Sequence, residues 1–124
     1  MDKRVSEAEL EIMEALWSAA PQAVSAAEVA ERVPESRGWS LPTVKTMLSR
    51  LTQKGAVRHE AEGRRYLYSP AIERDSYVGN ESRRLVDRLF GGRLTPMIAR
   101  LAEDEAITDS EIAEIEALLK ELKK

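Results

Sequence analysis

The sequence predicts a mainly α-helical fold with one small β-hairpin, on three observations. Apolar residues recur at helical spacing in several separate segments between residues 7 and 122. Three segments begin with a Ser or Thr that has a Glu three positions later, which is the pattern of a capping box. Residues 56–70 instead hold two short runs of β-forming residues around a glycine-containing turn. Helices, one hairpin and then more helices are therefore expected.

The first two expected helices are short and amphipathic. The capping box Ser6–Glu9 opens a helix over about 7–18. Pro21 ends it, because the residue before a proline avoids helical geometry. A second capping box at Ser25 opens a shorter helix that Pro34 stops.

The third expected helix, over about 41–54, has strong signals at both ends. Ser40 is a good N-cap, and Pro42 lies in the first turn, where a missing N–H costs nothing. Gly55 is the expected C-cap. The hairpin follows, and Trp39 is our candidate for a minimal third strand. Three helices and a hairpin joined by short links are the order of a winged helix-turn-helix domain.

Only helices are expected after Pro70. We place them at about 71–90, 96–102 and 109–122. Their apolar seams are carried by some fifty residues, which is marginal for an independent core. We therefore expect a winged-helix domain at 1–70 and a C-terminal helical dimerisation domain at 71–124. The alternative is that these helices fold back on the N-terminal domain of the same chain.

Composition excludes several kinds of site. The absence of cysteine excludes disulfides and thiolate metal sites, and the single histidine, His59, excludes a multi-histidine metal site within one chain. No cofactor is expected. The longest apolar stretches fall far short of the ~20 residues that cross a bilayer, and the start has no signal-peptide core. We expect a soluble, cytoplasmic protein without membrane insertion.

Charge is distributed unevenly along the chain. The formal net charge is −3, which by itself argues against a nucleic-acid partner. Residues 37–70, however, carry seven basic and only two acidic side chains, Glu60 and Glu62. Because the local field decides phosphate binding, this basic middle third is the candidate nucleic-acid contact.

The expected helix at 41–54 has two distinct faces. Val44, Met47, Leu48 and Leu51 fall within roughly 100° of arc and form the inner stripe. The outer face has no acidic residue and holds the polar side chains of Thr43, Lys45, Thr46, Ser49, Arg50 and Gln53. Such side chains suit base edges and phosphates, and carboxylates there would be repelled by DNA. The alternative is an ordinary surface helix of biased composition.

The hairpin adds a weaker indication. Arg64 and Arg65 lie at the turn, where a wing would approach a phosphate, although such a pair is usually just solvated. Tyr66 and Tyr68 share one strand face, and we interpret both as core residues. His59 is interpreted as a structural histidine, because no convergent acid–base or nucleophile set accompanies it. We therefore do not expect an enzyme.

These residues resemble one family of repressors over nearly the whole chain, namely the penicillinase-repressor and methicillin-resistance-repressor family, which also includes copper-responsive repressors. The matching stretches are Ser6–Glu9 with Met13 and Leu16–Trp17, Trp39–Ser40, Thr43–Thr46, Arg50–Leu51, Lys54–Gly55, Arg65–Pro70 and Leu89–Gly92. The chain lacks the C-terminal cysteine cluster of the copper-responsive branch, so that mechanism is not expected here.

The resemblance implies a homodimeric transcriptional repressor on an inverted-repeat operator of double-stranded DNA. By residue match, Ser40 touches a phosphate, and Thr43, Lys45, Thr46 and Arg50 face the groove. We expect Lys54, Arg64 and Arg65 to add phosphate contacts. In related repressors a membrane sensor-protease relieves repression by cleavage, after an antibiotic or other envelope signal, and the matching bond is near Arg100-Leu101. A winged-helix protein-interaction module without DNA binding is the alternative.

Overall fold

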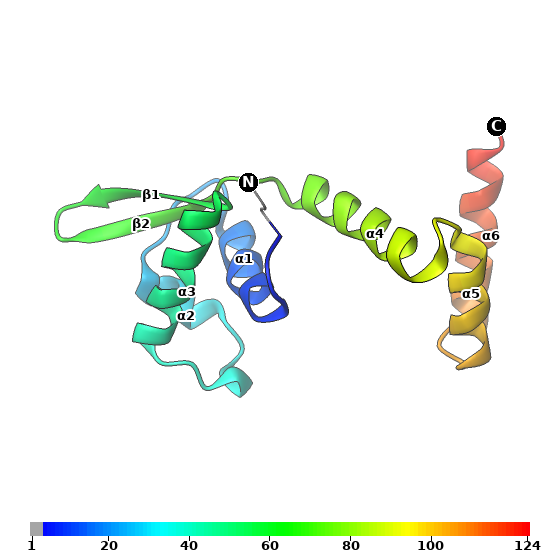
Figure 1. Ribbon diagram of the computed structural model, residues 1–124, viewed down its shortest axis with the longest axis horizontal. Helices are drawn as coiled ribbons and strands as arrows, with labels where there is room; N and C mark the ends of the chain where they lie inside the picture. Colours follow the sequence, from blue (N-terminus) through cyan, green and yellow to red (C-terminus); the bar gives the residue numbers. More distant parts are fainter. Residues whose placement is uncertain (1–3) are drawn as a thin grey trace. The chain divides into compact units, whose positions relative to one another are not determined.

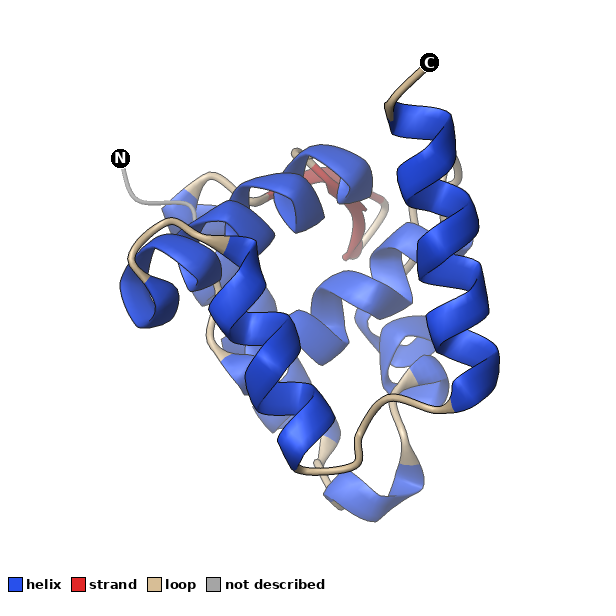
Figure 2. Ribbon diagram, turned by 90° about the vertical axis from the view of Figure 1, so that its right-hand side faces the viewer, coloured by secondary structure: helices blue, strands red, loops and turns tan. Residues whose placement is uncertain are grey.

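The structure is a computed structural model that describes residues 4–124, and it has the expected order of elements (Figure 1). The N-terminal elements are α1 (Glu7–Ala19), α2 (Ala26–Arg32), a 3-10 turn (Glu35–Arg37), α3 (Leu41–Lys54), β1 (Val57–Glu62) and β2 (Arg65–Pro70). The remaining elements are α4 (Arg74–Phe90), α5 (Leu94–Glu103) and α6 (Asp109–Leu122). Helices make up most of the described chain, with a single hairpin (Figure 2). The predicted fold class is confirmed.

The chain divides into two compact units, Met1–Tyr77 and Val78–Lys124. The boundary lies inside α4, so that the first turn of this helix belongs to the first unit. All three predicted capping boxes are present, at Ser6, Ser25 and Thr108. In each, the cap hydroxyl accepts from the N3 amide and the N3 glutamate accepts from the cap amide, which satisfies two otherwise unpaired donors.

The core of the first unit lies where its three helices and the hairpin meet. Its largest fully buried side chains come from all three helices: Ile12, Met13, Leu16, Val29, Val44, Leu48 and Leu51. Burial of a leucine-sized side chain stabilises a fold by about 1.5–3 kcal/mol. This core therefore holds α3 firmly by its inner stripe.

The third strand is not where the sequence led us to expect it. Val24, in the link between α1 and α2, forms an antiparallel bridge with Tyr68 of β2. The amide of Val24 donates to the Tyr68 carbonyl at 2.9 Å, and the amide of Tyr68 donates to the Val24 carbonyl at 2.7 Å. Our assignment of this strand to Trp39 was wrong, because the buried, β-branched Val24 satisfies the edge of β2 instead.

The two tyrosines of β2 differ in burial. Tyr68 packs against the core, as predicted, and burial raises the pKa of its hydroxyl. Tyr66 is 51% exposed, so its interpretation as a core residue was wrong. Its ring meets the His59 ring edge-on at 4.6 Å across the hairpin. The pleat puts Tyr66 and Tyr68 on one face, but Tyr66 lies nearer the turn, and of the two only Tyr68 packs against the core.

The second unit lacks a buried interior. No residue of α5 or α6 is buried, and the same holds for α4. Large apolar side chains remain open along these helices, with Leu122 72% exposed, and the others are Val78, Leu89, Leu94, Leu101, Ile112, Leu118 and Leu119. These exposed apolar side chains are the candidates for the dimer contact that the sequence predicts. None of the helices in the described part of the chain is long and apolar enough to span a bilayer.

Candidate nucleic-acid interface

Helix α3 is defined at both ends by the residues that the sequence singled out. The Ser40 hydroxyl accepts from the Thr43 amide at 3.3 Å, and Pro42 lies in the first turn. Gly55 closes the helix with a φ of +83°, a left-handed conformation that costs glycine little. The observed bounds, Leu41–Lys54, agree with the prediction.

The two faces of α3 are those that the sequence predicts. The inner stripe is buried, and Leu48 and Leu51 are 0% exposed. Every predicted contact residue on the outer face is exposed: Thr43, Lys45, Thr46, Ser49 and Arg50. Gln53 is exposed as well. A carboxylate-free helix face thus lies open on the described part of this chain.

The polar groups of this face differ in what they already bond. The Thr46 hydroxyl donates to the Pro42 carbonyl at 3.0 Å, and the hydroxyls of Ser40 and Thr43 lie 3.0 Å apart. These bonds fix the three hydroxyl groups while leaving each a further lone pair or proton. Lys45 and Arg50 form no ion pair with any residue from 4 to 124. Their charges are therefore available to a ligand.

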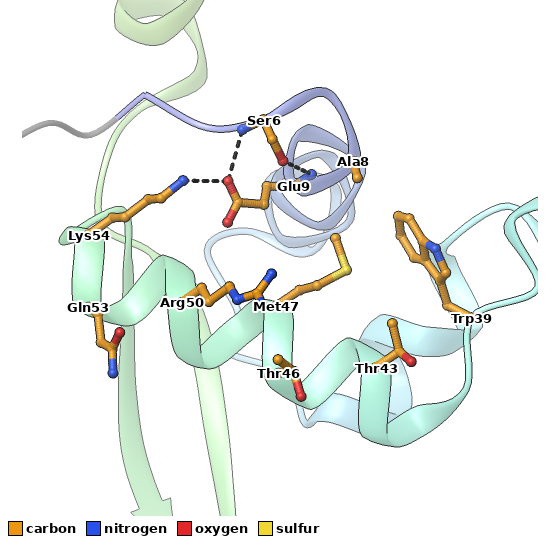
Figure 3. A pocket seen from close by; sticks show the side chains of 10 residues that line it. All are labelled: Ser6, Ala8, Glu9, Trp39, Thr43, Thr46, Met47, Arg50, Gln53 and Lys54. Carbon is orange, nitrogen blue, oxygen red and sulfur yellow. Dashed lines mark hydrogen bonds and ion pairs between the residues drawn. The ribbon is translucent and has the colours of Figure 1, made fainter.

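Lys54 is engaged differently from what we expected of a phosphate contact. Its Nζ lies 2.5 Å from Oε1 of Glu9 and also donates to the Arg4 carbonyl at 3.3 Å. Burial raises the pKa of the Glu9 carboxyl, but the hydrogen bonds from Lys54 and Ser6 outweigh it and hold that pKa below its usual value. Figure 3 shows Lys54 reaching toward α1, while Thr46 and Gln53 point away from it. The pair ties the end of α3 to the start of α1.

A groove of about 860 Å³ runs between α3 and the first turn of α1 (Figure 3). Its polar lining comes mainly from α3, with Thr43, Thr46, Arg50, Gln53 and Lys54, and its apolar lining includes Met47, Ala8 and Trp39. The one carboxylate in it, Glu9, is paired with Lys54. The groove thus combines an apolar lining with the polar side chains of α3, and of its two cations only Arg50 has no ion pair among the described residues.

The hairpin carries its two predicted arginines at the turn. Cross-strand register runs from Val57 opposite Pro70 to Glu62 opposite Arg65, and Gly63 opens the turn with a φ of +63°. Arg65 pairs with Glu62 at 2.9 Å, and this hydrogen bond raises its pKa. Arg64 is exposed at the tip and has no ion pair among residues 4–124. Of the two, Arg64 is the freer cation.

One cluster beside α3 escaped the sequence analysis. The Arg37 guanidinium lies 5.3 Å from the Trp39 ring centroid and pairs with Glu11 at 2.9 Å. This contact braces the segment that leads into the Ser40 cap. The partners are 26 residues apart, so no local spacing signals the pair. In the sequence, only the closeness of Arg37 to Trp39, two positions later, could have indicated it.

The candidate cleavage bond, Arg100-Leu101, lies in α5 of the second unit. Arg100 is exposed and pairs with Asp104 one turn later at 3.4 Å, and Leu101 is 36% exposed. The bond sits inside a regular helix, ten residues long. A protease would therefore need local unwinding before the peptide could enter its active site.

Comparison with known proteins gives a consistent picture. A family profile described as "Penicillinase repressor" matches residues 5–121. The penicillinase repressor of Bacillus licheniformis is 33% identical over 120 residues, which is 97% of this chain and 92% of that protein. The methicillin resistance regulatory protein MecI of Mammaliicoccus sciuri is 24% identical over 115 residues, covering 93% and 92%. The solution structure of the DNA-binding domain of the repressor BlaI superposes with a TM-score of 0.52 at 37% identity, covering 60% of this chain and 89% of that one.

Proposed function

Because the chain belongs to the penicillinase repressor family, we propose that it is a transcriptional repressor that binds double-stranded operator DNA through α3. The observation that carries this proposal is the open, carboxylate-free face of α3. A helix that lies between two rows of phosphates in the major groove must avoid negative charge, and this helix does so over all fourteen of its residues. The family is one of repressors, so we propose no catalytic activity.

Within this interface we assign base readout to the outer face of α3, through Thr43, Lys45, Thr46, Ser49 and Arg50. Each good bidentate contact to a base discriminates by about 1–3 kcal/mol. Ser40 and Arg64 are proposed as phosphate contacts because both are exposed. Lys54 and Arg65 are also proposed as phosphate contacts, although both already form ion pairs within the chain. Each must leave or share its carboxylate partner to reach a phosphate, so we expect smaller contributions from them.

We further propose that the repressor acts as a homodimer on an inverted-repeat operator. The support is the second unit, whose helices expose several leucines and Ile112 and bury none of their residues. A second copy offers the same seam, and a two-fold pair matches two half-sites. Such a repressor works in the cytoplasm, where its operator is.

Derepression by a membrane sensor-protease that cuts near Arg100-Leu101 is also part of the proposal. A cut there would separate α6, with the exposed Leu118 and Leu122, from the rest of the chain. The dimer would then lose part of its apolar contact surface. Once the two copies separate, only one winged-helix domain would bind each half of the operator. Cleavage by the sensor in a reconstituted membrane, followed by fragment masses, tests the position of the bond.

The decisive test is a gel-shift titration with Arg50→Ala beside Arg32→Ala, which removes the same charge from an exposed position in α2. We expect Arg50→Ala to weaken operator binding about tenfold to a hundredfold, and Arg32→Ala to change it far less. Affinity should also fall steeply with salt, with a log–log slope of about −0.9 for each phosphate neutralised. Equal effects of the two variants, or a flat salt dependence, would favour a protein-interaction module.

A further inference from the structure

The first turn of α4 is fastened to α1 by three contacts of different chemistry. The first joins Trp17 to the link before α4. The indole Nε1–H of Trp17 donates to the Ile72 carbonyl at 2.9 Å, and both side chains pack on the edge of the core. This bond spans 55 residues of sequence and is partly shielded from water. It fixes the path of the backbone two residues before α4 begins.

The second contact fixes the helix itself. The Tyr77 ring lies 5.8 Å from the Trp17 ring, tilted by 43°. The Tyr77 hydroxyl also accepts from the Val5 amide at 3.3 Å. Tyr77 belongs to the first turn of α4 and is the last residue of the first unit. The Tyr77 side chain is thus held by its ring, against Trp17, and by its hydroxyl, against Val5. These two contacts restrain rotation of the first turn about the helix axis.

The third contact is an ion pair on the exposed side of the same turn. Nε of Arg74 lies 2.7 Å from Oε1 of Glu14, and this hydrogen bond raises the pKa of the guanidinium. An exposed pair adds little stability. Its value here is geometric, because it gives α4 a third point of attachment to α1, distinct from Trp17.

We propose that these residues, Trp17, Ile72, Arg74 and Tyr77, form a latch that sets the half-site spacing the repressor accepts. The proposal rests on the proposed function, since it needs a DNA-binding dimer. A short link of residues 71–73 without attachments would let α4 leave the winged-helix unit in many directions and tolerate many spacings. With its first turn attached to α1 and to Val5, α4 has fewer directions in which it can continue from the winged-helix unit. Trp17 and Tyr77 thus act as positioning residues, which we assign no contact with DNA.

Two variants loosen the latch without removing the interface. Trp17→Phe keeps an aromatic ring and loses the N–H donor to Ile72, and Tyr77→Ala removes both ring and hydroxyl contacts. Ser76→Ala is the matched control, because Ser76 is exposed in the same turn. All are made in the full-length chain. Sedimentation and thermal unfolding confirm that each variant is a folded dimer before DNA is added.

The probe is a DNA duplex that the wild-type chain selects from a random-sequence pool. Two further kinds of duplex are derived from it: the isolated half-site, and versions in which the spacer between the half-sites is longer or shorter by one or two base pairs. We expect the wild type and Ser76→Ala to lose roughly tenfold or more in affinity away from the best spacing. For Trp17→Phe and Tyr77→Ala we expect that penalty to shrink to about twofold to threefold, with half-site affinity unchanged within about twofold.

Three outcomes overturn the latch. The first is that affinity depends on spacer length in both variants as it does in the wild type. The second is that affinity for the isolated half-site falls as far as affinity for the whole operator, which would mean that these residues only support the winged-helix fold. The third is loss of the dimer in the variants. If the wild-type chain selects no two-part duplex at all, the proposed function fails first and the latch with it.

Discussion

The two units of this chain differ in where their apolar side chains lie. In the first unit, leucine, isoleucine and valine side chains from three helices converge on one core. In the second unit, no residue of the three helices is buried, although Leu118, Leu119 and Leu122 share α6. A unit with its own core can hold a binding surface in place without help. For a unit without one we expect that a partner completes it, as the proposed homodimer would.

Ion pairs show the same contrast. In the first unit three pairs join residues far apart in sequence: Glu9–Lys54, Glu11–Arg37 and Glu14–Arg74. The pairs described within the second unit are local, three or four residues apart: Glu81–Arg84, Arg100–Asp104 and Glu121–Lys124. Long-range pairs tie elements together, whereas local pairs only support the helix that contains them. The first unit is therefore specified internally and the second is not.

The strongest test of this contrast is Leu118→Asp in α6. If two copies bury the apolar side of α6 against each other, the substitution removes one buried leucine from each copy. Each leucine contributes about 1.5–3 kcal/mol, so the free energy of dimerisation should fall by about 3–6 kcal/mol. The dissociation constant of the dimer should then rise about a hundredfold or more, as measured by sedimentation over a range of concentrations. Ala113→Asp, on the polar side of α6 with Glu116 and Lys120, is the control. An unchanged dimer would remove the basis for pairing through α6.

The corresponding change in the first unit is Leu48→Ala, at the centre of the α3 stripe. Leu48 is fully buried, so the substitution leaves a cavity and should lower the free energy of unfolding by about 2–5 kcal/mol. Leu41→Ala, on the exposed start of the same helix, should cost far less. Urea denaturation measures both. The loss at Leu48 should not depend on protein concentration, and a concentration-dependent loss would mean that the first unit also relies on a partner.

The sequence predicted local features well and long-range ones poorly. The bounds of α3, all three capping boxes and the buried stripe follow from spacing within a few turns, and each is confirmed. The bridge at Val24 was missed because its partner, Tyr68, is 44 positions away and no periodicity links them. The exposure of Tyr66 depends on how far the hairpin extends beyond the helices. Charge counts likewise revealed the cations near α3 but not that Lys54 is bound to Glu9.

Glycine substitutions should have opposite signs in the two units. Gly55 ends α3 with a φ of +83°, so Gly55→Ala should destabilise the first unit by about 1–2 kcal/mol. Gly79 lies within α4 at an ordinary φ with open space around its Cα, so Gly79→Ala should stabilise that helix by about 0.5–1 kcal/mol. Thermal unfolding of the two variants gives the comparison. A stabilising effect at Gly55 would contradict the left-handed cap.

The smallest effect concerns acid and the pair that ties α3 to α1. The pKa of Glu9 is lower in the folded chain than its usual value, so the folded state binds fewer protons and stability rises with pH. The contribution of Glu9 is complete above the unfolded pKa of about 4.3 and is lost as the pH falls through the lower, folded pKa. Glu9→Gln keeps an N3 side chain that can cap Ser6 but removes the titration.

We therefore expect Glu9→Gln to cost about 1 kcal/mol or less at pH 7, and to flatten the loss of stability that sets in as the pH falls below about 4.3. Glu7→Gln, an exposed change in the same first turn, is the control. Denaturation in urea at several pH values measures the slope. Lys54 and Glu9 lie in different elements of the first unit. A flatter dependence of stability on pH in Glu9→Gln would therefore show that part of the acid sensitivity of this unit comes from the contact that joins α3 to α1. An unchanged slope would mean that solvent, and not Lys54, balances the buried carboxylate.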